Sequence, residues 1–174
     1  MEISVIWPGR LECDGHIYRC ALGRGGIVMD KREGDGGTPV GGFALRRVLY
    51  RPDRLDAPAT GLPVDAIAPE DGWCDDPAHP DYNRPVALPF AARHEKLWRD
   101  DEVYDVILIL GHNDDPPVPG KGSAIFMHVA RPDYASTEGC VALALEDLLA
   151  VLAGCRPGDT IRVNPPDKAP APRK

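Results

Sequence analysis

The chain has 174 residues, of which 43% are hydrophobic, and this is enough for one globular domain with a buried core. Its net charge of −7 argues against nucleic acid or an anionic membrane surface as a partner, because both require a clustered basic face. Aromatic residues make up only 6%, while 18 Gly and 19 Pro residues indicate many turns and disfavour an all-helical bundle.

The first fifty residues contain four short runs of apolar and β-branched residues, at 3–7, 16–22, 25–29 and 43–51, separated by Gly-rich turns. This pattern predicts a β meander. Residues 51–87 are rich in Pro and Asp and predict a long irregular loop, a feature that is usually functional or disordered. Trp73, Tyr82 and Asn83 favour an ordered loop. For Trp73, packing beneath the loop and a place in a substrate-binding wall are both open.

The second half of the chain alternates between predicted helices and strands. Residues 89–99 place apolar side chains near helical spacing after Pro89, which predicts a helix. Residues 103–110 and 125–129 predict two neighbouring central strands. A helix at 145–153 ends at Gly154, and a strand at 160–163 closes the sheet. We expect one domain over residues 1–164 and a disordered, Pro-rich tail over 165–174.

The five cysteines, at positions 13, 20, 74, 140 and 155, are predicted to be reduced. Cys13 and Cys20 flank a predicted hairpin and could face each other across it, but two partly buried thiols is the favoured interpretation. The chain has no CxxC motif that would suggest a structural zinc site. Its start has neither a basic segment nor a long apolar one, so we expect no signal peptide, no membrane span and a cytoplasmic location for the chain as written.

His128 and Cys140 are the strongest candidates for chemistry. His128 lies in the predicted strand 125–129, and Cys140 follows 12 residues later, after a turn that contains Pro132 and Gly139. An imidazole near a thiol of pKa about 8.5 can convert it into a nucleophile at neutral pH. The predicted helix after Cys140 would lower its pKa further through the helix dipole. The plain alternative is a buried structural Cys and a satisfied His.

Two motifs resemble those of the L,D-transpeptidase catalytic domain, the YkuD-like family. The first is a strand ending in His128, a turn, and then Thr137-Glu138-Gly139-Cys140-Val141. The second resembles the family's Gly-x-x-Thr-Pro-x-Gly-x-Phe stretch, with one residue fewer between Gly37 and Thr38, and is carried by Gly36, Thr38, Pro39, Gly41 and Phe43. Together the motifs extend the resemblance over nearly the whole chain, roughly residues 1–163.

The resemblance implies a mainly β fold with few helices (α+β), a β-sandwich of mixed sheets, with the long irregular loop as an insertion. It implies an L,D-transpeptidase, a cysteine acyltransferase that acts on peptidoglycan stem peptides or muropeptides and takes part in cell-wall biogenesis. Family activity is usually periplasmic or in the cell wall. No metal or organic cofactor enters the reaction, and we expect a monomer. L,D-carboxypeptidase activity, D-amino-acid exchange and non-catalytic muropeptide binding are the alternatives.

The resemblance also assigns roles to individual residues. Cys140 would be the nucleophile that releases D-alanine and forms a thioester, and His128 the general base and acid. Backbone N–H groups around Thr137, Gly139 and Cys140 would hold the oxyanion, as the flexibility of Gly139 permits.

The chain departs from the family at two positions beside the nucleophile. Many members carry His before the Gly-Cys pair and Arg two residues after the Cys, whereas this chain has Glu138 and Ala142. Arg131, or Arg84 in the long loop, could replace the positive charge that normally recognises the substrate carboxylate.

The remaining candidates lie in two predicted loops. His112 and Asn113 follow the strand 103–110, so His112 could approach the site, although a turn role for this segment is the plain alternative. Asn83 and Trp73, in the long loop, are the other predicted substrate-binding residues.

Overall fold

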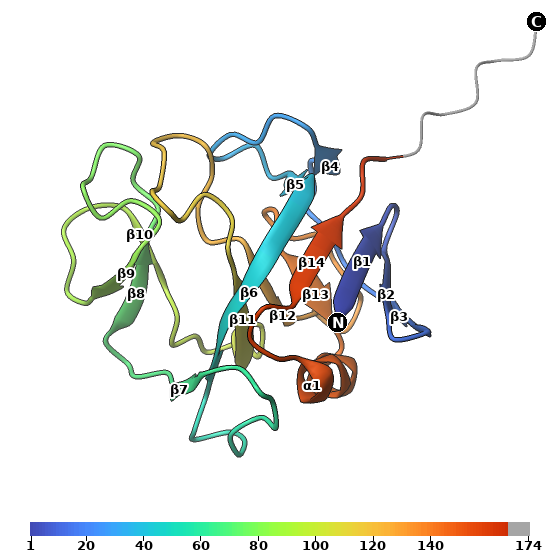
Figure 1. Ribbon diagram of the computed structural model, residues 1–174. Coiled ribbons are helices and arrows are strands. Elements are labelled where there is room, and N and C mark those ends of the chain that lie inside the picture. The colour runs from blue at the N-terminus through green and yellow to red at the C-terminus, as the bar shows by residue number, and fades with distance from the viewer. Residues whose placement is uncertain (167–174) are drawn as a thin grey trace, which may run out of the picture.

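A single curled sheet of nine strands organises the protein in the computed structural model, which describes residues 1–166 (Figure 1). The N-terminal strands β1 (Glu2–Ile6), β2 (Arg10–Cys13) and β3 (His16–Arg19) form a meander at one edge, which contains only the first two of the four runs predicted to form it. The remaining strands are β6 (Gly41–Tyr50), β7 (Val64–Ala66), β11 (Val106–Leu110), β12 (Phe126–Val129), β13 (Val141–Leu143) and β14 (Thr160–Val163). Their order is β13-β12-β11-β6-β14-β1-β2-β3, with β7 attached to β6.

The two edges of this sheet meet. Just after β3, Ala21 forms an antiparallel bridge to Ala142 of β13, with N–H···O distances of 2.8 and 2.9 Å in the two directions. The main sheet is therefore almost a closed barrel, which leaves few unpaired strand edges. The mainly β, mixed-sheet fold expected from the sequence is confirmed, and β14 lies inside the sheet between β6 and β1 rather than at its edge.

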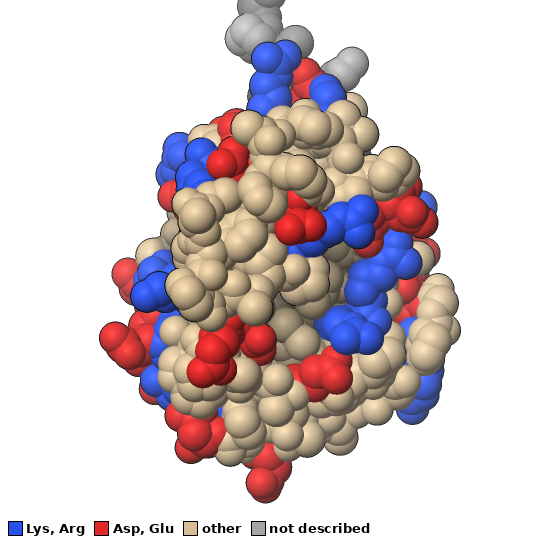
Figure 2. All heavy atoms as spheres, turned by 90° about the vertical axis from the view of Figure 1, so that its left-hand side faces the viewer, with Lys and Arg blue, Asp and Glu red and all other residues tan. Residues whose placement is uncertain are grey.

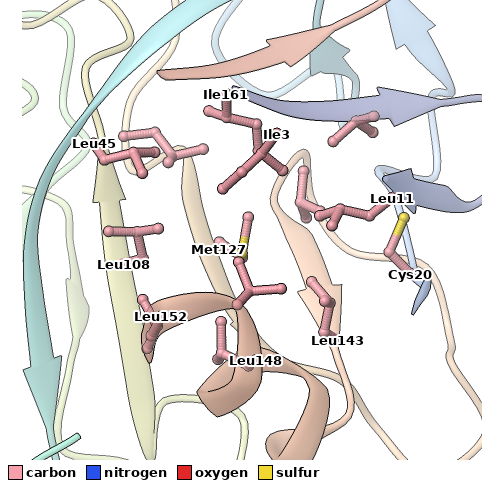
Figure 3. Packing of buried hydrophobic residues seen from close by; sticks show 14 of the residues in the cluster. Ile3, Leu11, Cys20, Leu45, Leu108, Met127, Leu143, Leu148, Leu152 and Ile161 are labelled. Carbon is pink, nitrogen blue, oxygen red and sulfur yellow. The ribbon is translucent and has the colours of Figure 1, made fainter. Parts of the chain in front are cut away.

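Within residues 1–166, one helix covers the core of this sheet. The helix α1 (Leu145–Gly154) begins as predicted and carries Glu146 and Asp147 in its first turn, where the helix dipole favours acidic side chains. Its inner face buries Leu148, Val151 and Leu152. Figure 3 shows Leu148 and Leu152 reaching toward strand residues such as Leu108, Met127 and Leu143. Strands and helix thus share one apolar core.

The segment predicted as a helix at 89–99 is a strand, and that prediction is wrong. It contains β10 (His94–Lys96), which pairs antiparallel with β8 (Asp71–Cys74) in a separate small sheet completed by β9 (Pro85–Ala87). Backbone hydrogen bonds to β8 stabilise β10, and this pairing with a distant segment cannot be predicted from a local amphipathic pattern. The long loop is thus partly ordered into strands.

Two further predictions concern the apolar run at 25–29 and the pair Cys13 and Cys20. The short strands β4 (Ile27–Val28) and β5 (Thr38–Pro39) pair in parallel and stand apart from the meander. Cys13 pairs across the β2–β3 hairpin with His16 rather than with Cys20, and all five cysteines are free and buried. Of the predicted tail, residues 167–174 lie outside the described residues.

On the face that carries β8 to β10, basic and acidic side chains are interspersed (Figure 2). Within residues 1–166 no helix has the length and apolar character needed to span a membrane.

The core predicts a matched pair of mutants. Leu108 is fully buried, so Leu108→Ala leaves a cavity and should lower the free energy of unfolding by roughly 2–5 kcal/mol. Met29 is 74% exposed, so Met29→Ala should change it by less than about 0.5 kcal/mol. Urea unfolding followed by circular dichroism measures both, and equal losses would contradict the assignment of Leu108 to the core.

Candidate active site

Two neighbouring parallel strands bring His128 and Cys140 to the same side of the sheet. His128 of β12 lies opposite Ala142 of β13, and Cys140 lies two residues before Ala142. The backbone N–H of Phe126, two residues before His128, donates to the Cys140 Sγ at 3.3 Å. Because side chains alternate along a strand, His128 and Cys140 point to one face as diagonal neighbours.

Both side chains open onto one large cleft of about 1100 Å³. Its walls come from the β10 segment and the residues after it, from the loop before β12, and from the turn between β12 and β13. The lining residues around the two candidates include Glu95, Arg99, Tyr104, Ala124, Arg131, Thr137 and Glu138. A cleft lined by convergent polar groups is the usual setting of a catalytic site.

Cys140 is held as a neutral thiol in this structure. Its Sγ donates to the Ala124 carbonyl oxygen at 3.2 Å and accepts from the Phe126 N–H. Burial raises its pKa to about 12, and the negative charge of Glu95 adds to this effect. The thiol therefore has almost no thiolate character at neutral pH in the absence of a bound molecule.

His128 has the tautomer that a general base needs. Its Nδ1 lies 3.0 Å from the Val129 carbonyl oxygen, and since a carbonyl can only accept, Nδ1 carries the hydrogen and Nε2 keeps its lone pair. Burial lowers the pKa of His128 to about 4, so the ring is neutral at pH 7. The ring of Tyr104 packs edge-on against it at 5.4 Å between centroids. Within residues 1–166, no hydrogen bond joins His128 to Cys140.

The turn before Cys140 is fixed by the side chain of Thr137. Its Oγ1 donates to the Cys140 carbonyl oxygen at 2.7 Å and accepts from the Gly139 N–H at 3.1 Å. The Thr137 N–H donates to the carbonyl oxygen of Leu22 at 3.0 Å. The N–H groups of Thr137 and Gly139 are thus engaged in shaping the turn, and this geometry does not leave them free for the oxyanion that the sequence assigned to them.

The Gly-Thr-Pro stretch at residues 36–39 packs against this turn. Gly139 has φ +134°, and a Cβ there would lie 2.7 Å from the Gly37 carbonyl oxygen. A Cβ at Gly23 would overlap the Gly36 carbonyl oxygen, and the Gly23 N–H donates to Thr38 Oγ1 at 2.9 Å. Three backbone segments therefore approach one another more closely than side chains would permit.

Comparison with family models agrees with both motifs. A model of the L,D-transpeptidase catalytic domain (YkuD) matches residues 12–163. The chain belongs to this family. Searches of curated proteins and of solved structures each gave no match. The two motifs that meet at Gly37 and Gly139 both lie within the matched residues, which associates this L,D-transpeptidase domain with action on peptidoglycan peptides.

Three of the residues predicted to bind substrate in this L,D-transpeptidase domain do not line the cleft: Trp73, Asn83 and His112. Asn83 Oδ1 accepts from Trp73 Nε1 at 2.9 Å and from the Ala124 N–H at 3.0 Å, while its Nδ2 donates to the His112 and Asn113 carbonyls. Trp73 packs edge-on against Phe126 at 5.1 Å between centroids. Their hydrogen bonds and packing place these residues beside the cleft rather than in its lining, and their part in substrate binding stays a prediction.

The departures from the family motif have clear structural consequences. Ala142 is buried within β13, and its backbone exchanges hydrogen bonds with that of Ala21. Glu138 is exposed and pairs with Arg24 at 2.9 Å. Arg131 does line the cleft, half exposed, whereas Arg84 does not. The use of either residue as a substitute for the missing Arg stays a prediction.

The structure adds Glu95 and Tyr104, which sequence reasoning missed. Tyr104 Oη donates to Glu95 Oε2 at 2.7 Å, and both residues line the cleft with Cys140. Glu95 lies in the segment predicted as a helix. That prediction concealed that Glu95 lies in a strand, opposite Trp73 of β8. The predicted helix dipole at Cys140 is also wrong, because β13 separates Cys140 from α1.

The close approach at Gly139 predicts a strong effect of one methyl group. Gly139→Ala should lower the free energy of unfolding by roughly 2–4 kcal/mol, because the Cβ meets backbone and the φ is positive. Gly120→Ala is the control, since Gly120 also has positive φ (+80°) but no atom within 4 Å of the added Cβ. Thermal unfolding compares them, and equal destabilisation would show that the contact with Gly37 is unimportant.

Burial of His128 predicts a specific pH dependence of stability. Its pKa is lower in the folded than in the unfolded chain, so the stability it contributes is complete above pH 6.5 and declines as the pH falls toward 4. The decline should reach roughly 3 kcal/mol in the native chain and be absent in His128→Gln. Urea unfolding at several pH values between 7 and 4 measures the difference, and parallel curves would contradict it.

Proposed function

We propose that this protein is a cysteine acyltransferase that acts on peptidoglycan stem peptides through a Cys140 thioester. The proposed donor is a tetrapeptide stem, attacked at the carbonyl of the L-centre of its diamino acid, with release of D-alanine. The observation that carries the proposal is the convergence of His128 and Cys140, from adjacent strands of an L,D-transpeptidase domain, on one cleft.

Acylation requires the thiol to leave its backbone partners and turn toward His128. As Sγ attacks the carbonyl carbon, the thiol proton passes to Nε2 of His128, which Val129 holds in the correct tautomer. The raised pKa of Cys140 and the lowered pKa of His128 both oppose a preformed ion pair, so proton transfer accompanies the attack. The proton on Nε2 then goes to the leaving amine of D-alanine as the C–N bond breaks.

The charges around the cleft support recognition of a peptide carboxylate. Arg131 lies at the cleft with its side chain about half exposed, and its nearest acidic group is Asp101 at 3.9 Å. That distance leaves the guanidinium able to form a direct ion pair with a substrate carboxylate. We assign Arg131 the role that the Arg two residues after the Cys has in many family members.

The thioester can be resolved in three ways that share the same first half-reaction. An amine of a second stem peptide gives a crosslink, a free D-amino acid gives exchange, and water gives carboxypeptidase activity. Each regenerates Cys140 as a thiol when the incoming nucleophile loses its proton.

Mutation of Cys140 tests the nucleophile. Incubation with a defined tetrapeptide should add the mass of the stem less D-alanine to the native protein, and Cys140→Ala should abolish both the adduct and D-alanine release. Cys74→Ala, which removes a buried thiol outside the cleft, should retain both. Intact-protein and peptide mass spectrometry locate the adduct. An adduct on Cys13 or Cys74 would contradict the assignment.

A non-catalytic module that binds muropeptides is the second candidate. It is favoured by the hydrogen bonds that tie the Cys140 thiol to Ala124 and Phe126 rather than to His128. This candidate predicts muropeptide binding by calorimetry that Cys140→Ala leaves unchanged, with no covalent adduct in the native protein. The mass measurement above therefore separates the two functions.

A further inference from the structure

Glu95 presents a partly buried carboxylate to the cleft that contains Cys140. It lies in β10, opposite Trp73 of β8, and its Oε2 accepts a hydrogen bond from Tyr104 Oη at 2.7 Å. Its Oε1 accepts no hydrogen bond from residues 1–166. Every fully buried side-chain nitrogen or oxygen among these residues has a partner, so Oε1 is reached from the cleft.

Glu95 has no ion-pair partner within the described part of the chain. No Lys, Arg or His side chain there forms a salt bridge with it, although the positive charge of Arg99 partly offsets the effect of burial on its pKa. Arg99 itself binds Asp101 with both Nε and Nη2, at 2.7 and 2.6 Å, and Arg93 binds Asp75. A partly buried carboxylate without an ion-pair partner is costly, and a bound cation would lower that cost.

The position of Glu95 near Cys140 limits which kind of cation would bind to it. Its charge acts on the Cys140 thiol, whose pKa it helps to raise, so it opposes loss of the thiol proton during attack on the donor. A positive group between Glu95 and Cys140 would reverse this effect. Among the reactants of the proposed function, the amine that resolves the thioester is such a group, because an alkylamine is protonated at neutral pH.

We propose that Glu95 binds the ammonium group of the acyl acceptor and takes the proton that must leave before the amine can attack. The inference rests on the proposed function and specifies it: the acceptor is a primary amine, and the chain is built for transpeptidation rather than hydrolysis. Tyr104 positions the carboxylate through its hydrogen bond to Oε2, leaving Oε1 for the ammonium.

The ammonium group of the acceptor loses two protons in the proposed step. One ammonium proton passes to Oε1 of Glu95, and the neutral amine attacks the thioester carbonyl to form the C–N bond. The attacking nitrogen then loses a second proton to Nε2 of His128. As the C–S bond breaks, the sulfur leaves and receives that proton, which regenerates the Cys140 thiol. The proton on Glu95 is released to solvent through the cleft. Burial raises the pKa of Glu95 and makes it a stronger base than an exposed carboxylate.

The test separates the two half-reactions. Native protein and Glu95→Gln are incubated with a tetrapeptide donor, with and without a stem tripeptide whose diamino acid carries a free side-chain amine. Gln can still accept from Tyr104, so the wall of the cleft is preserved. The acyl-enzyme should form in Glu95→Gln at least as fast as in the native protein, but the ratio of aminolysis to hydrolysis should fall by about 10²-fold.

Asp100→Asn is the matched control. Asp100 also lines the cleft, but it is exposed and its side chain forms no hydrogen bond with Tyr104, so its partition ratio should remain native. Slower acylation in Glu95→Gln, an equal loss of aminolysis and hydrolysis, or an unchanged ratio would each overturn the inference. Absence of any acyl-enzyme in the native protein would instead overturn the proposed function, and the mass spectrum shows which has failed.

Discussion

The close contact of three backbone segments beside Cys140 is the constraint on which the candidate site depends. Gly23, Gly37 and Gly139 approach within distances that a single Cβ would disrupt, and Thr38 and Thr137 fix the segments with hydroxyl hydrogen bonds. The turn before Cys140 is thus held by residues from two distant parts of the chain. This explains physically why the Gly-Thr-Pro stretch and the Thr-x-Gly-Cys stretch occur in one protein.

Desolvation governs the chemistry that this rigid turn can support. Burial moves the pKa of Cys140 and that of His128 in directions that keep both groups neutral, and the thiol rests on backbone groups of Ala124 and Phe126. Because both groups are neutral, the proposed attack requires the proton to move from the thiol to His128 during the chemical step. Glu95 and Tyr104 add a hydrogen-bonded polar pair to the wall of the cleft.

The position after Cys140 at which the chain departs from the family lies where the main sheet closes. Ala142 lies in β13 where this strand meets Ala21, and the two backbones exchange hydrogen bonds. Ala142 is buried, whereas Arg131 is about half exposed and lines the cleft. The role that we propose for Arg131 therefore takes the positive charge from a different segment than in many family members.

The sequence by itself determined the elements that depend on local pattern: the N-terminal meander, the strands at β11 and β12, the helix α1, and the motif residues His128 and Cys140. Strong hydrophobic periodicity and Gly-containing turns carry that information. Only the tertiary structure decided the rest. It placed Trp73, Asn83 and His112 beneath the site and turned the expected helix at 89–99 into β10, bringing Glu95 to the cleft. Pairing between distant segments fixes these positions, and no local pattern encodes it.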